Sequence, residues 1–501
     1  MVEGLLAGIS TAFSFDALMF LLLGCLAGTF IGMLPGLGPM TAIAIMIPIA
    51  STLEPAIGII MMAAVYYGAI FGGSTSSILV NAPGVASTVA TSFDGYPMAR
   101  RGEAGKALTI AALSSFAGGM IAALMLILAA PLLAKFSLLF QSSDYFALMI
   151  LGLVCVAAFA GSGGMLKALL MTVVGMMLAT VGTDPAQGVM RFTLGKVDLI
   201  DGLSFLMLVM ATFALSEALL AILRMPQTQT AKPIANKVRS TQISRAEAKH
   251  IIPAIGRSSL LGFLIGLLPG AGATIASFLA YGSEQRLASP SESAKFGQGS
   301  LRGLAAPEAA NNAAATGSFV PLLTLGIPGS GTTAILLGAL IAYGVQPGPM
   351  LYINEPALFW SVIVSMWLGN IALLALNLPL IPYYATLLNV PTQILMPMVL
   401  FFSLIGVYLI SFNEFDIQLM IVFSATAVVL RLLDFPMAPM ILGFILGGMI
   451  EENLGRALLI YNDSWSFLWE RPLTFGLTCL TGLVLSAPLL RGLTHKVSKR
   501  K

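Results

Sequence analysis

The sequence predicts an all-α polytopic membrane protein with about 11–12 membrane segments, and three observations carry that prediction. First, 57% of the 501 residues are apolar and only 9% are charged, whereas soluble proteins have about 25% charged residues. Second, charges are absent from stretches long enough for helices that cross or re-enter a bilayer, namely residues 17–53, 55–93, 107–134, 309–354 and 356–413. Third, the chain contains an internal repeat that is interrupted at matching positions. These features exclude a soluble enzyme, a nucleic-acid binder, a disordered scaffold and a β-barrel, whose strands alternate apolar and polar residues.

The distribution of basic residues predicts the orientation in the membrane. Residues 224–257 carry seven Lys or Arg against the single acid Glu247, and the tail from Arg491 onward is also basic. By the positive-inside rule both segments, and with them the C-terminus, belong in the cytoplasm. Arg100, Arg101 and Lys106 indicate a third cytoplasmic loop. The start of the chain lacks a basic n-region, so we expect no cleavable signal.

The predicted membrane passes begin from an external N-terminus and place every basic cluster in the cytoplasm. Residues 17–50 enter and return, and the next passes are 56–93, 107–133, 145–160, 166–182 and 203–223. After the basic loop, 258–283 enter and return, followed by 306–345, 356–378, 391–411, 417–433, 436–450 and 473–490. Hydropathy leaves open whether the interrupted segments are re-entrant hairpins or broken crossings.

The internal repeat consists of two motifs that recur in the same order. GTFIGMLPGLG at 28–38 aligns without gaps on GFLIGLLPGAG at 262–272, and NAPG at 81–84 corresponds to GIPG at 326–329. We therefore expect a first membrane repeat over 1–223, a basic cytoplasmic linker over 224–257 and a second membrane repeat over 258–501. An odd number of passes in the first repeat makes the second copy inverted, as in many secondary transporters. The pairs Gly28/Gly32 and Gly262/Gly266 predict close helix packing.

Each Pro-Gly pair within an apolar stretch predicts a break between two half-helices. Proline removes a backbone donor and clashes with the preceding turn, and glycine permits positive φ. We expect a hydroxyl to cap each following half-helix, from Thr41, Thr274, Ser87 or Thr88, and Thr332 or Thr333. Freed backbone groups are tolerated only inside protein or beside an aqueous cavity. Helix N-termini suit an anion, and carbonyl groups at unwound turns suit a small cation.

Polar residues around the breaks complete a candidate site for substrate and ion. Polar side chains at membrane depth usually face a bundle interior or a pathway, although serines also bond to their own helix. Asn311 and Asn312 are the favoured ligand pair. Glu308 either joins an ion path or lies near the cytoplasmic end, and Asp94 and Glu217 are expected at interfaces. The candidate residues are Pro35, Gly36, Gly38, Thr41, Ser74, Thr75, Ser76, Asn81, Gly84, Ser87, Thr88, Pro269, Gly270, Gly272, Thr274, Asn311, Asn312, Thr316, Gly329, Ser330, Thr332 and Thr333.

The missing residue types point to transport rather than chemistry. No Lys or Arg lies near the centre of the repeat spans, so an anion would be held by dipoles, hydroxyls, amides and cations bound with it. The chain has no Walker sequence for ATP, no HExxH motif and no membrane-embedded aspartate pair. We therefore expect cation symport by a protein that is not an enzyme and has neither a covalently bound cofactor nor a metal site. An ion or carboxylate channel is the alternative, and an intramembrane enzyme is a weaker one.

The motifs resemble those of the large membrane subunit of the tripartite tricarboxylate transporters. The resemblance rests on LPGLGPMTAIAIMIP at 34–48, YYGAIFGGSTSSILVNAPG at 66–84, DGYPMARRG at 94–102, LPGAGATIASFLAYG at 268–282 and the segment from APEAANN to LLGAL at 306–340. One departure is Val85, where many relatives are expected to have an acidic residue.

The resemblance implies a multi-pass permease of the bacterial inner membrane. Its partners would be a small membrane subunit, a periplasmic solute-binding protein and the lipid bilayer, with no nucleic acid. The substrates would be citrate-like di- or tricarboxylates, and Na⁺ or H⁺ would be the coupling cation. Kinship with transporters that have inward-pointing hairpins leaves both an elevator and a rocking movement open.

Overall fold

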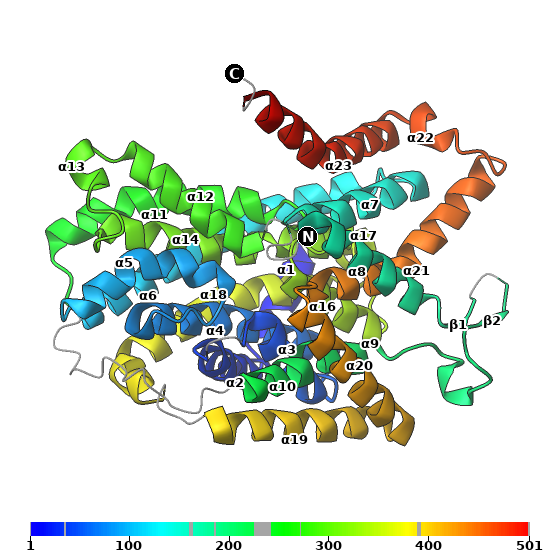
Figure 1. Cartoon of the computed structure of the whole chain (residues 1–501), viewed down its shortest axis with the longest axis horizontal. Helices are drawn as coiled ribbons and strands as arrows, with labels where there is room; N and C mark the ends of the chain where they lie inside the picture. The colour runs from blue at the N-terminus through cyan, green and yellow to red at the C-terminus, as the bar shows by residue number, and fades with distance from the viewer. Residues whose placement is uncertain are drawn as a thin grey trace. The chain divides into compact units, whose positions relative to one another are not determined.

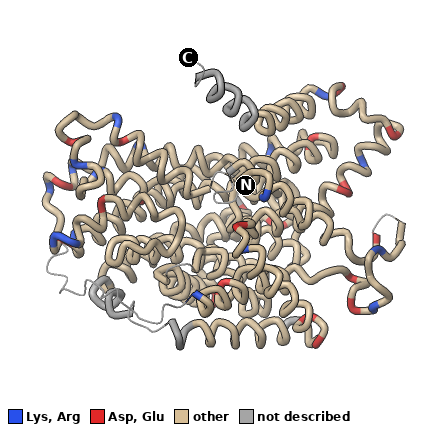
Figure 2. Tube along the Cα trace, viewed as in Figure 1, with Lys and Arg blue, Asp and Glu red and all other residues tan. Residues whose placement is uncertain are grey.

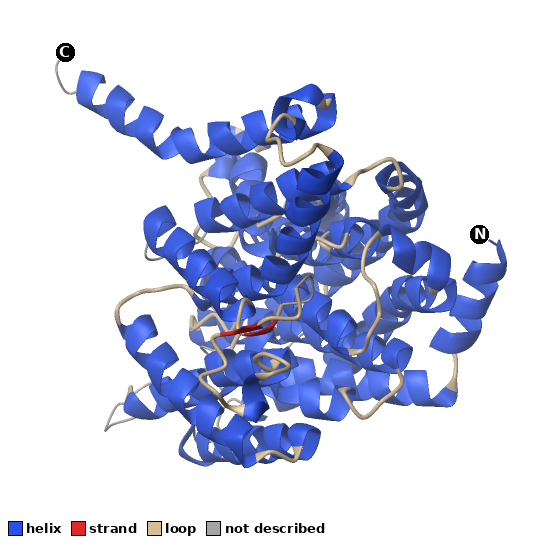
Figure 3. Cartoon of the chain, turned by 90° about the vertical axis from the view of Figure 1, so that its right-hand side faces the viewer, coloured by secondary structure: helices blue, strands red, loops and turns tan. Residues whose placement is uncertain are grey.

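The computed structural model describes residues 2–34, 37–159, 164–184, 187–224, 242–270, 272–387 and 392–498. Almost all of this backbone is helical, apart from a small antiparallel ladder in which Gly182 pairs with Arg191 and Thr183 with Met190 (Figure 3). The chain divides into two compact units: Met1–Ala134 with Phe205–Val428 (unit 1), and Lys135–Ser204 with Val429–Lys501 (unit 2).

Unit 1 contains both copies of the two recurring motifs, at 28–38 with 81–84 and at 262–272 with 326–329 (Figure 1). Its elements are α1 (Val2–Ala12), α2 (Phe15–Gly32), α3 (Pro39–Ala50), α4 (Pro55–Val80), the 3₁₀ turn η1 (Ala86–Thr88), α5 (Val89–Arg100), most of α6 (Ala104–Ser137), α9 (Phe205–Val209), the π-helix η3 (Met210–Leu215), α10 (Ser216–Leu223), α11 (Arg245–Gly266), α12 (Gly272–Leu287), α13 (Pro290–Ser293), α14 (Leu301–Gly317), α15 (Phe319–Leu325), α16 (Gly331–Ala342), α17 (Pro349–Asn354), α18 (Pro356–Leu387), α19 (Thr392–Ser411) and most of α20 (Glu414–Leu432).

Unit 2 contains two helix pairs, one packed through a glycine and the other joined by polar contacts. Its elements are α7 (Ser142–Phe159), α8 (Gly164–Ala179), β1 (Gly182–Thr183), β2 (Met190–Arg191), η2 (Val197–Leu199), α21 (Met437–Ile460), α22 (Phe467–Glu470) and α23 (Pro472–Ser498). Helices α8 and α21 approach so closely that a Cβ on Gly175 would lie 1.9 Å from the carbonyl oxygen of Met440. Asp144 on α7 accepts hydrogen bonds from Arg471 and Thr474, at 2.6 Å each, and so ties α7 to α23.

The apolar helices confirm the prediction of an all-α membrane protein. Seven helices in the described ranges are long and apolar enough to cross a bilayer, and shorter apolar helices such as α3 and α16 accompany them. In Figure 2 much of the helical trace in unit 1 lacks acidic and basic residues, and many of its charges gather around α11, α12 and α13. The inverted relation between the repeats stays a prediction.

Two helices form the centre of unit 1, one from each repeat. Every residue from Ile57 to Leu79 on α4, and every residue from Gly303 to Gly317 on α14, is buried. A helix that is buried on all sides needs neighbours on all sides, and α2, α3, α5 and α18 pack on α4 while α11, α12, α5 and α15 pack on α14. Pro55 at the first position of α4 suits a helix start because it has no N–H to leave unpaired.

Glycines allow the central helices to touch their partners backbone to backbone. A Cβ on Gly28 or Gly262 would lie 2.3 Å from the carbonyl oxygen of Val65 or Ala310, respectively. One turn later, Gly32 faces Ala69 and Gly266 faces Ala314 in the same way. The predicted close packing at both GxxxG pairs is therefore confirmed. We call these two contacts, α2 on α4 and α11 on α14, the glycine seams.

Helix α11 begins inside the segment that the sequence predicts to be a linker. Ser244 and Glu247 form a capping box, in which each side chain accepts a hydrogen bond from the other residue's backbone N–H. The ion pair with Lys106, together with the N–H of Ser244, lowers the pKa of Glu247 to about 2. Residues 225–241 of the predicted linker lie outside the described residues.

Candidate functional site

All four breaks separate helices, as predicted. We name them in chain order: the first lies between α2 and α3, the second between α4 and η1, the third between α11 and α12, and the fourth between α15 and α16. The candidates Pro35 and Gly36, in the first break, lie outside the described residues.

The second and fourth breaks have the same local structure. Helix α4 ends at Asn81 with φ 54° and ψ 32°, and α15 ends at Gly326 with φ 69° and ψ 26°. This left-handed conformation is open to glycine and, among other residues, best tolerated by Asn. The exposed Asn81 therefore acts as a helix terminator in the structure. Its predicted role as a ligand is untested.

Within each repeat the two breaks lie against each other. The N–H of Gly270 donates to the carbonyl oxygen of Gly329 at 3.0 Å, which joins the third break to the fourth. In the first repeat, a Cβ on Gly84 would lie only 1.8 Å from the carbonyl oxygen of Gly32, at the end of α2. A Cβ on Gly329 would likewise lie 2.9 Å from the carbonyl oxygen of Gly266. Glycine is required at both positions because backbone occupies the space of a side chain.

The two repeats also pack on each other in a reciprocal way. The second break continues into η1, which packs on α12 and α14 of the second repeat, and the fourth break continues into α16, which packs on α3 and α4 of the first. The side-chain amide of Asn311 donates to the carbonyl oxygen of Ser87 at 3.4 Å. In return, the hydroxyl of Tyr66 on α4 lies near those of Ser330 and Thr332. The segments that follow the second and fourth breaks thus pack on helices of the other repeat within unit 1.

The fourth break carries the best-formed helix start among the breaks. Ser330 accepts a hydrogen bond from the N–H of Thr333 at 3.2 Å, and Thr333 accepts one from the N–H of Ser330 at 2.8 Å. This reciprocal cap orders the first turn of the twelve-residue α16. Thr332 and Thr333 are both buried.

The hydroxyls predicted to cap the helices after the first and second breaks do not do so, and the cap of α12 involves position 271, which lies outside the described residues. The N-cap of α3 is Gly38, which has no side chain to bond with, and no side-chain hydrogen bond caps this helix. The hydroxyl of Thr41 instead donates to the carbonyl oxygen of Phe213 in η3 at 3.3 Å. The N-cap of η1 is the apolar Val85, and Thr88 donates to the carbonyl oxygen of Val85 at 3.0 Å. Thr274 is a half-buried residue inside α12 whose carbonyl accepts from Ser277.

The asparagine pair is buried in the middle of α14. The Nδ2 of Asn312 donates to the Oδ1 of Asn311 at 2.7 Å and to the carbonyl oxygen of Glu308 at 3.0 Å. The Oδ1 of Asn312 has no hydrogen-bond partner among the described residues, although buried polar atoms are normally paired. Thr316 donates to the carbonyl oxygen of Asn312 at 3.2 Å, which extends these polar contacts by one helical turn.

Glu308 lies at the centre of a polar cluster that the candidate set did not include. Its carboxylate is completely buried and accepts hydrogen bonds from Ser74 on α4, Thr91 on α5 and Ser115 on α6. The distances from Ser74 are 2.8 and 2.7 Å, and the distance from Ser115 is 2.7 Å. We call these four residues the Glu308 cluster. Whether Glu308 joins an ion path or lies near the cytoplasmic end stays open.

A small cavity lies beside the Glu308 cluster. The space open to the centre of a water molecule is about 20 Å³, enough for one water-sized occupant. Its lining includes the cluster residues Ser74 and Ser115, the candidate Thr75 and the amide residue Asn377. The remaining predicted serine, Ser76, bonds to the carbonyl oxygen of Gly73 on its own helix.

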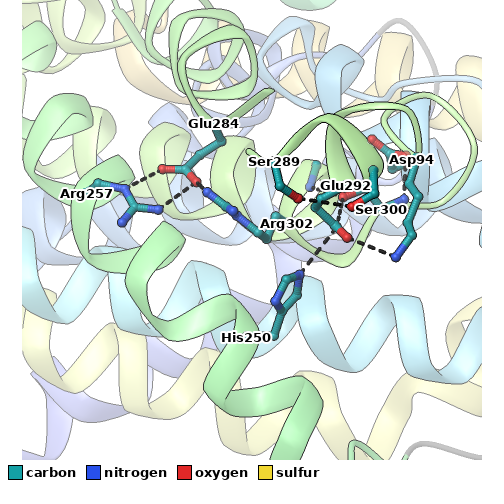
Figure 4. A network of polar contacts seen from close by, with 11 residues as sticks. Asp94, His250, Arg257, Glu284, Ser289, Glu292, Ser300 and Arg302 are labelled. Carbon is teal, nitrogen blue, oxygen red and sulfur yellow. Dashed lines mark hydrogen bonds and ion pairs between the residues drawn. The ribbon is translucent and has the colours of Figure 1, made fainter. Parts of the chain in front are cut away.

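A separate network of ion pairs surrounds the ends of α11–α14 (Figure 4). Glu284 is 1% exposed and accepts from both Arg257, at 2.7 Å, and Arg302. His250 lies 3.3 Å from Glu292. Asp94, expected at an interface, is buried in the protein and accepts from the N–H groups of Gly299 and Ser300, at 2.7 Å each. This network joins α5, α11, α12 and α14 near one end.

Other candidates contribute backbone geometry rather than polar groups. Gly270 and Gly272 have φ values of 79° and 58°, so the third break uses conformations that favour glycine. Pro269 precedes them and is half-buried. Thr91 and Ser115 were missed because an isolated hydroxyl in an apolar stretch gives no sequence signal of its partner. Glu308 did give a signal in the sequence, because it immediately precedes the uncharged stretch 309–354.

Two curated proteins are similar in sequence to this chain. A curated protein of Agrobacterium vitis, described as an uncharacterized 52.8 kDa protein in the TAR-I ttuC' 3' region, is 41% identical over 99% of this chain and 98% of its own length. A second A. vitis protein, described as an uncharacterized protein in the TAR-II ttuC' 3' region, is 43% identical over 48% of this chain and 97% of its own length. No solved structure matches.

The family comparison covers most of the chain and includes all four breaks. Residues 18–442 match the family model described as tripartite tricarboxylate transporter TctA family. The chain therefore belongs to the tripartite tricarboxylate transporter TctA family.

Proposed function

We propose that this protein is the large transmembrane subunit of a binding-protein-dependent secondary transporter. It imports citrate-like di- or tricarboxylates in symport with Na⁺ or H⁺. The observation that carries the proposal is that the segments following the breaks of each repeat pack on helices of the other repeat within unit 1. Irregular backbone at membrane depth is tolerated where it is enclosed by protein or lines a cavity, which is how many transporters build their sites.

Recognition of the carboxylate is assigned to the fourth break and the asparagine pair. The start of α16 carries the positive end of the helix dipole, which favours an anion. Asn311 and Asn312 add amide groups from α14. Because 309–354 contains no Lys or Arg, the substrate's charge is balanced by dipoles and by cations that bind with it.

Cation coupling follows from the energetics of the membrane potential. Moving one charge against the potential costs about 2.3 kcal/mol per 100 mV. Accumulating a di- or tricarboxylate therefore requires cations that travel with it or another source of energy. The sequence has no Walker motif, which favours an ion gradient as that source.

The family supports a three-part assembly in the bacterial inner membrane. A tripartite transporter includes, besides this permease, a small membrane subunit and a periplasmic solute-binding protein. We place the C-terminus in the cytoplasm on the basis of its basic residues.

Transport in a reconstituted system tests this proposal. Proteoliposomes containing both membrane subunits receive the binding protein and labelled citrate or another carboxylate, with Na⁺ and H⁺ gradients imposed separately. We expect accumulation above the external concentration with at least one gradient, and none without the binding protein. Equilibration without accumulation would instead indicate a channel. Failure to take up any carboxylate under either gradient would overturn the assignment.

A further inference from the structure

We infer that Glu308 is the carboxylate ligand of a Na⁺ site formed between α4, α5, α6 and α14. The observation behind this inference is a fully buried acid that is surrounded by hydroxyls and lies beside a small cavity. Binding of the ion stands on this geometry alone, whereas its role in coupling rests on the proposed function.

The other buried acids show how this protein normally neutralises such groups. Four acidic side chains in the described ranges are at most 1% exposed: Asp94, Asp144, Glu284 and Glu308. Glu284 is paired with two arginines, and Asp144 with Arg471. Asp94 accepts from two backbone N–H groups at the start of α14, where the helix dipole favours a negative charge.

Glu308 has none of these means of neutralisation. No Lys, Arg or His in the described part of the chain forms an ion pair with it, and its partners are neutral side chains. A buried charge without a counter-charge is very costly unless it is paired or coordinates an ion. A bound cation supplies the missing charge.

The surrounding groups select the kind of cation. The hydroxyls of Ser74, Thr91 and Ser115 donate to the carboxylate, and such bonds stabilise its ionised form rather than its protonated one. When the ion enters, each hydroxyl can rotate and offer a lone pair as a ligand. Oxygen ligands suit hard cations. One carboxylate balances one positive charge, so the set fits a monovalent ion.

The adjoining cavity provides the space that the ion requires. Its volume of about 20 Å³ suits one small occupant, and Ser74 and Ser115 belong both to its wall and to the Glu308 cluster. Glu308 does not itself line the cavity, so an entering ion contacts Ser74 and Ser115 first and reaches the carboxylate as their hydroxyls rotate.

The ion site is directly connected to the groups assigned to the substrate. Asn312 lies one helical turn after Glu308 and donates to its carbonyl oxygen. Asn311, next to it, bonds to Ser87 in the second break. A cation at Glu308 therefore sits within about one helical turn, 5.4 Å along the axis, of the two amides that the proposed function assigns to the carboxylate. Occupation of one site favours occupation of the other by direct attraction.

Sodium binding to the purified permease tests the site without any transported substrate. Binding of ²²Na⁺ is measured in choline chloride of constant ionic strength and pH, without carboxylate or partner subunits. We expect saturable binding of one Na⁺ per chain that excess K⁺ does not abolish. Glu308→Gln should remove the saturable component, and Ser115→Ala should weaken it about tenfold.

A matched control distinguishes the loss of a sodium ligand at Ser115 from the loss of any hydroxyl group on α6. Thr109 lies on α6, as Ser115 does, but its hydroxyl donates to the carbonyl oxygen of Gly105 in the same helix. Thr109→Ala should bind Na⁺ as the wild type does. Melting in Na⁺-free buffer and a monodisperse elution profile check that each variant folds. If Glu308→Gln does not fold, weakened Na⁺ binding by Ser115→Ala tests the site instead.

The outcomes distinguish this inference from the proposed function. Undiminished Na⁺ binding by Glu308→Gln and Ser115→Ala, or proton binding with no Na⁺ binding in the wild type, overturns the sodium site. Sodium binding that depends on Glu308 in a protein that transports no carboxylate leaves the site standing and removes the proposed function. Carboxylate uptake driven by Na⁺ and unaffected by Glu308→Gln leaves the proposed function standing and overturns the role of this site in coupling.

Discussion

At the scale of single residues, the two repeats share a geometry but differ in chemistry. The glycine seams pair Val65 with Ala310 as counterparts, which makes Tyr66 and Tyr67 the counterparts of Asn311 and Asn312. The tyrosines stack on each other, with ring centroids 5.9 Å apart, where the asparagines share a hydrogen bond. One repeat thus contributes aromatic surface to the interior and the other contributes amides.

Two substitutions test the assignment of the substrate groups. Asn312→Ala and Thr333→Ala should each lower carboxylate uptake at least tenfold, since the first removes an amide and the second breaks the cap that orders α16. Initial uptake rates are normalised to the amount of permease in the membrane. Thr333→Ser, which keeps the hydroxyl, should retain most of the activity. Ser365→Ala on α18 is the control, because that hydroxyl bonds to its own helix. Normal uptake by both alanine variants would remove these residues from the site.

At the scale of elements, the sequence predicts the helices and their interruptions well. Long uncharged stretches and Pro-Gly pairs determine the backbone conformation of their own neighbourhood. The helix ends at Gly32, Val80, Gly266 and Leu325 can therefore be predicted from them. Tertiary contacts decide what the sequence does not show. The hydroxyl of Thr41 was expected to cap a helix but bonds to η3, and Ser115 gave no sign that its partner would be Glu308. Partners distant in the chain cannot be identified from the local pattern.

The glycine seams permit a matched pair of substitutions. Gly262→Ala places a Cβ 2.3 Å from the carbonyl oxygen of Ala310, so α11 must move away from α14. We expect a loss of about 1–3 kcal/mol in the free energy of unfolding. Gly282→Ala on α12 meets no atom within 4 Å and should be neutral or stabilising by up to about 1 kcal/mol. Thermal melting of both variants in detergent measures the difference. Equal melting temperatures would contradict the packing of this seam.

At the scale of the whole molecule, the reciprocal contacts of unit 1 have the pattern that a two-fold relation between the repeats would produce. Helix α16 packs on α3 and α4, and η1 with α5 packs on α12 and α14. Combined with the odd number of passes that the sequence predicts for the first repeat, this pattern favours the predicted opposite orientations of the two copies in the membrane.

Labelling of two equivalent turns tests the inverted arrangement. Thr52 follows α3 and Ser289 follows α12, and both residues are exposed. In a background without Cys25, Cys155 and Cys479, Thr52→Cys should react with a membrane-impermeant maleimide added to intact spheroplasts. Ser289→Cys should react only after the membrane is permeabilised. Reaction of both residues from the same side would show that the copies are parallel.

The glycine seams also restrict how such a molecule can move. Where two helices meet through backbone atoms, no layer of side chains lies between them that could change rotamer and let one slide past the other. The carbonyl of Gly32 against Gly84 extends this restriction from α2 to the second break. Each helix pair and its turn must therefore move as one rigid body. Any displacement that moves a substrate across the bilayer must then occur along surfaces lined by larger side chains.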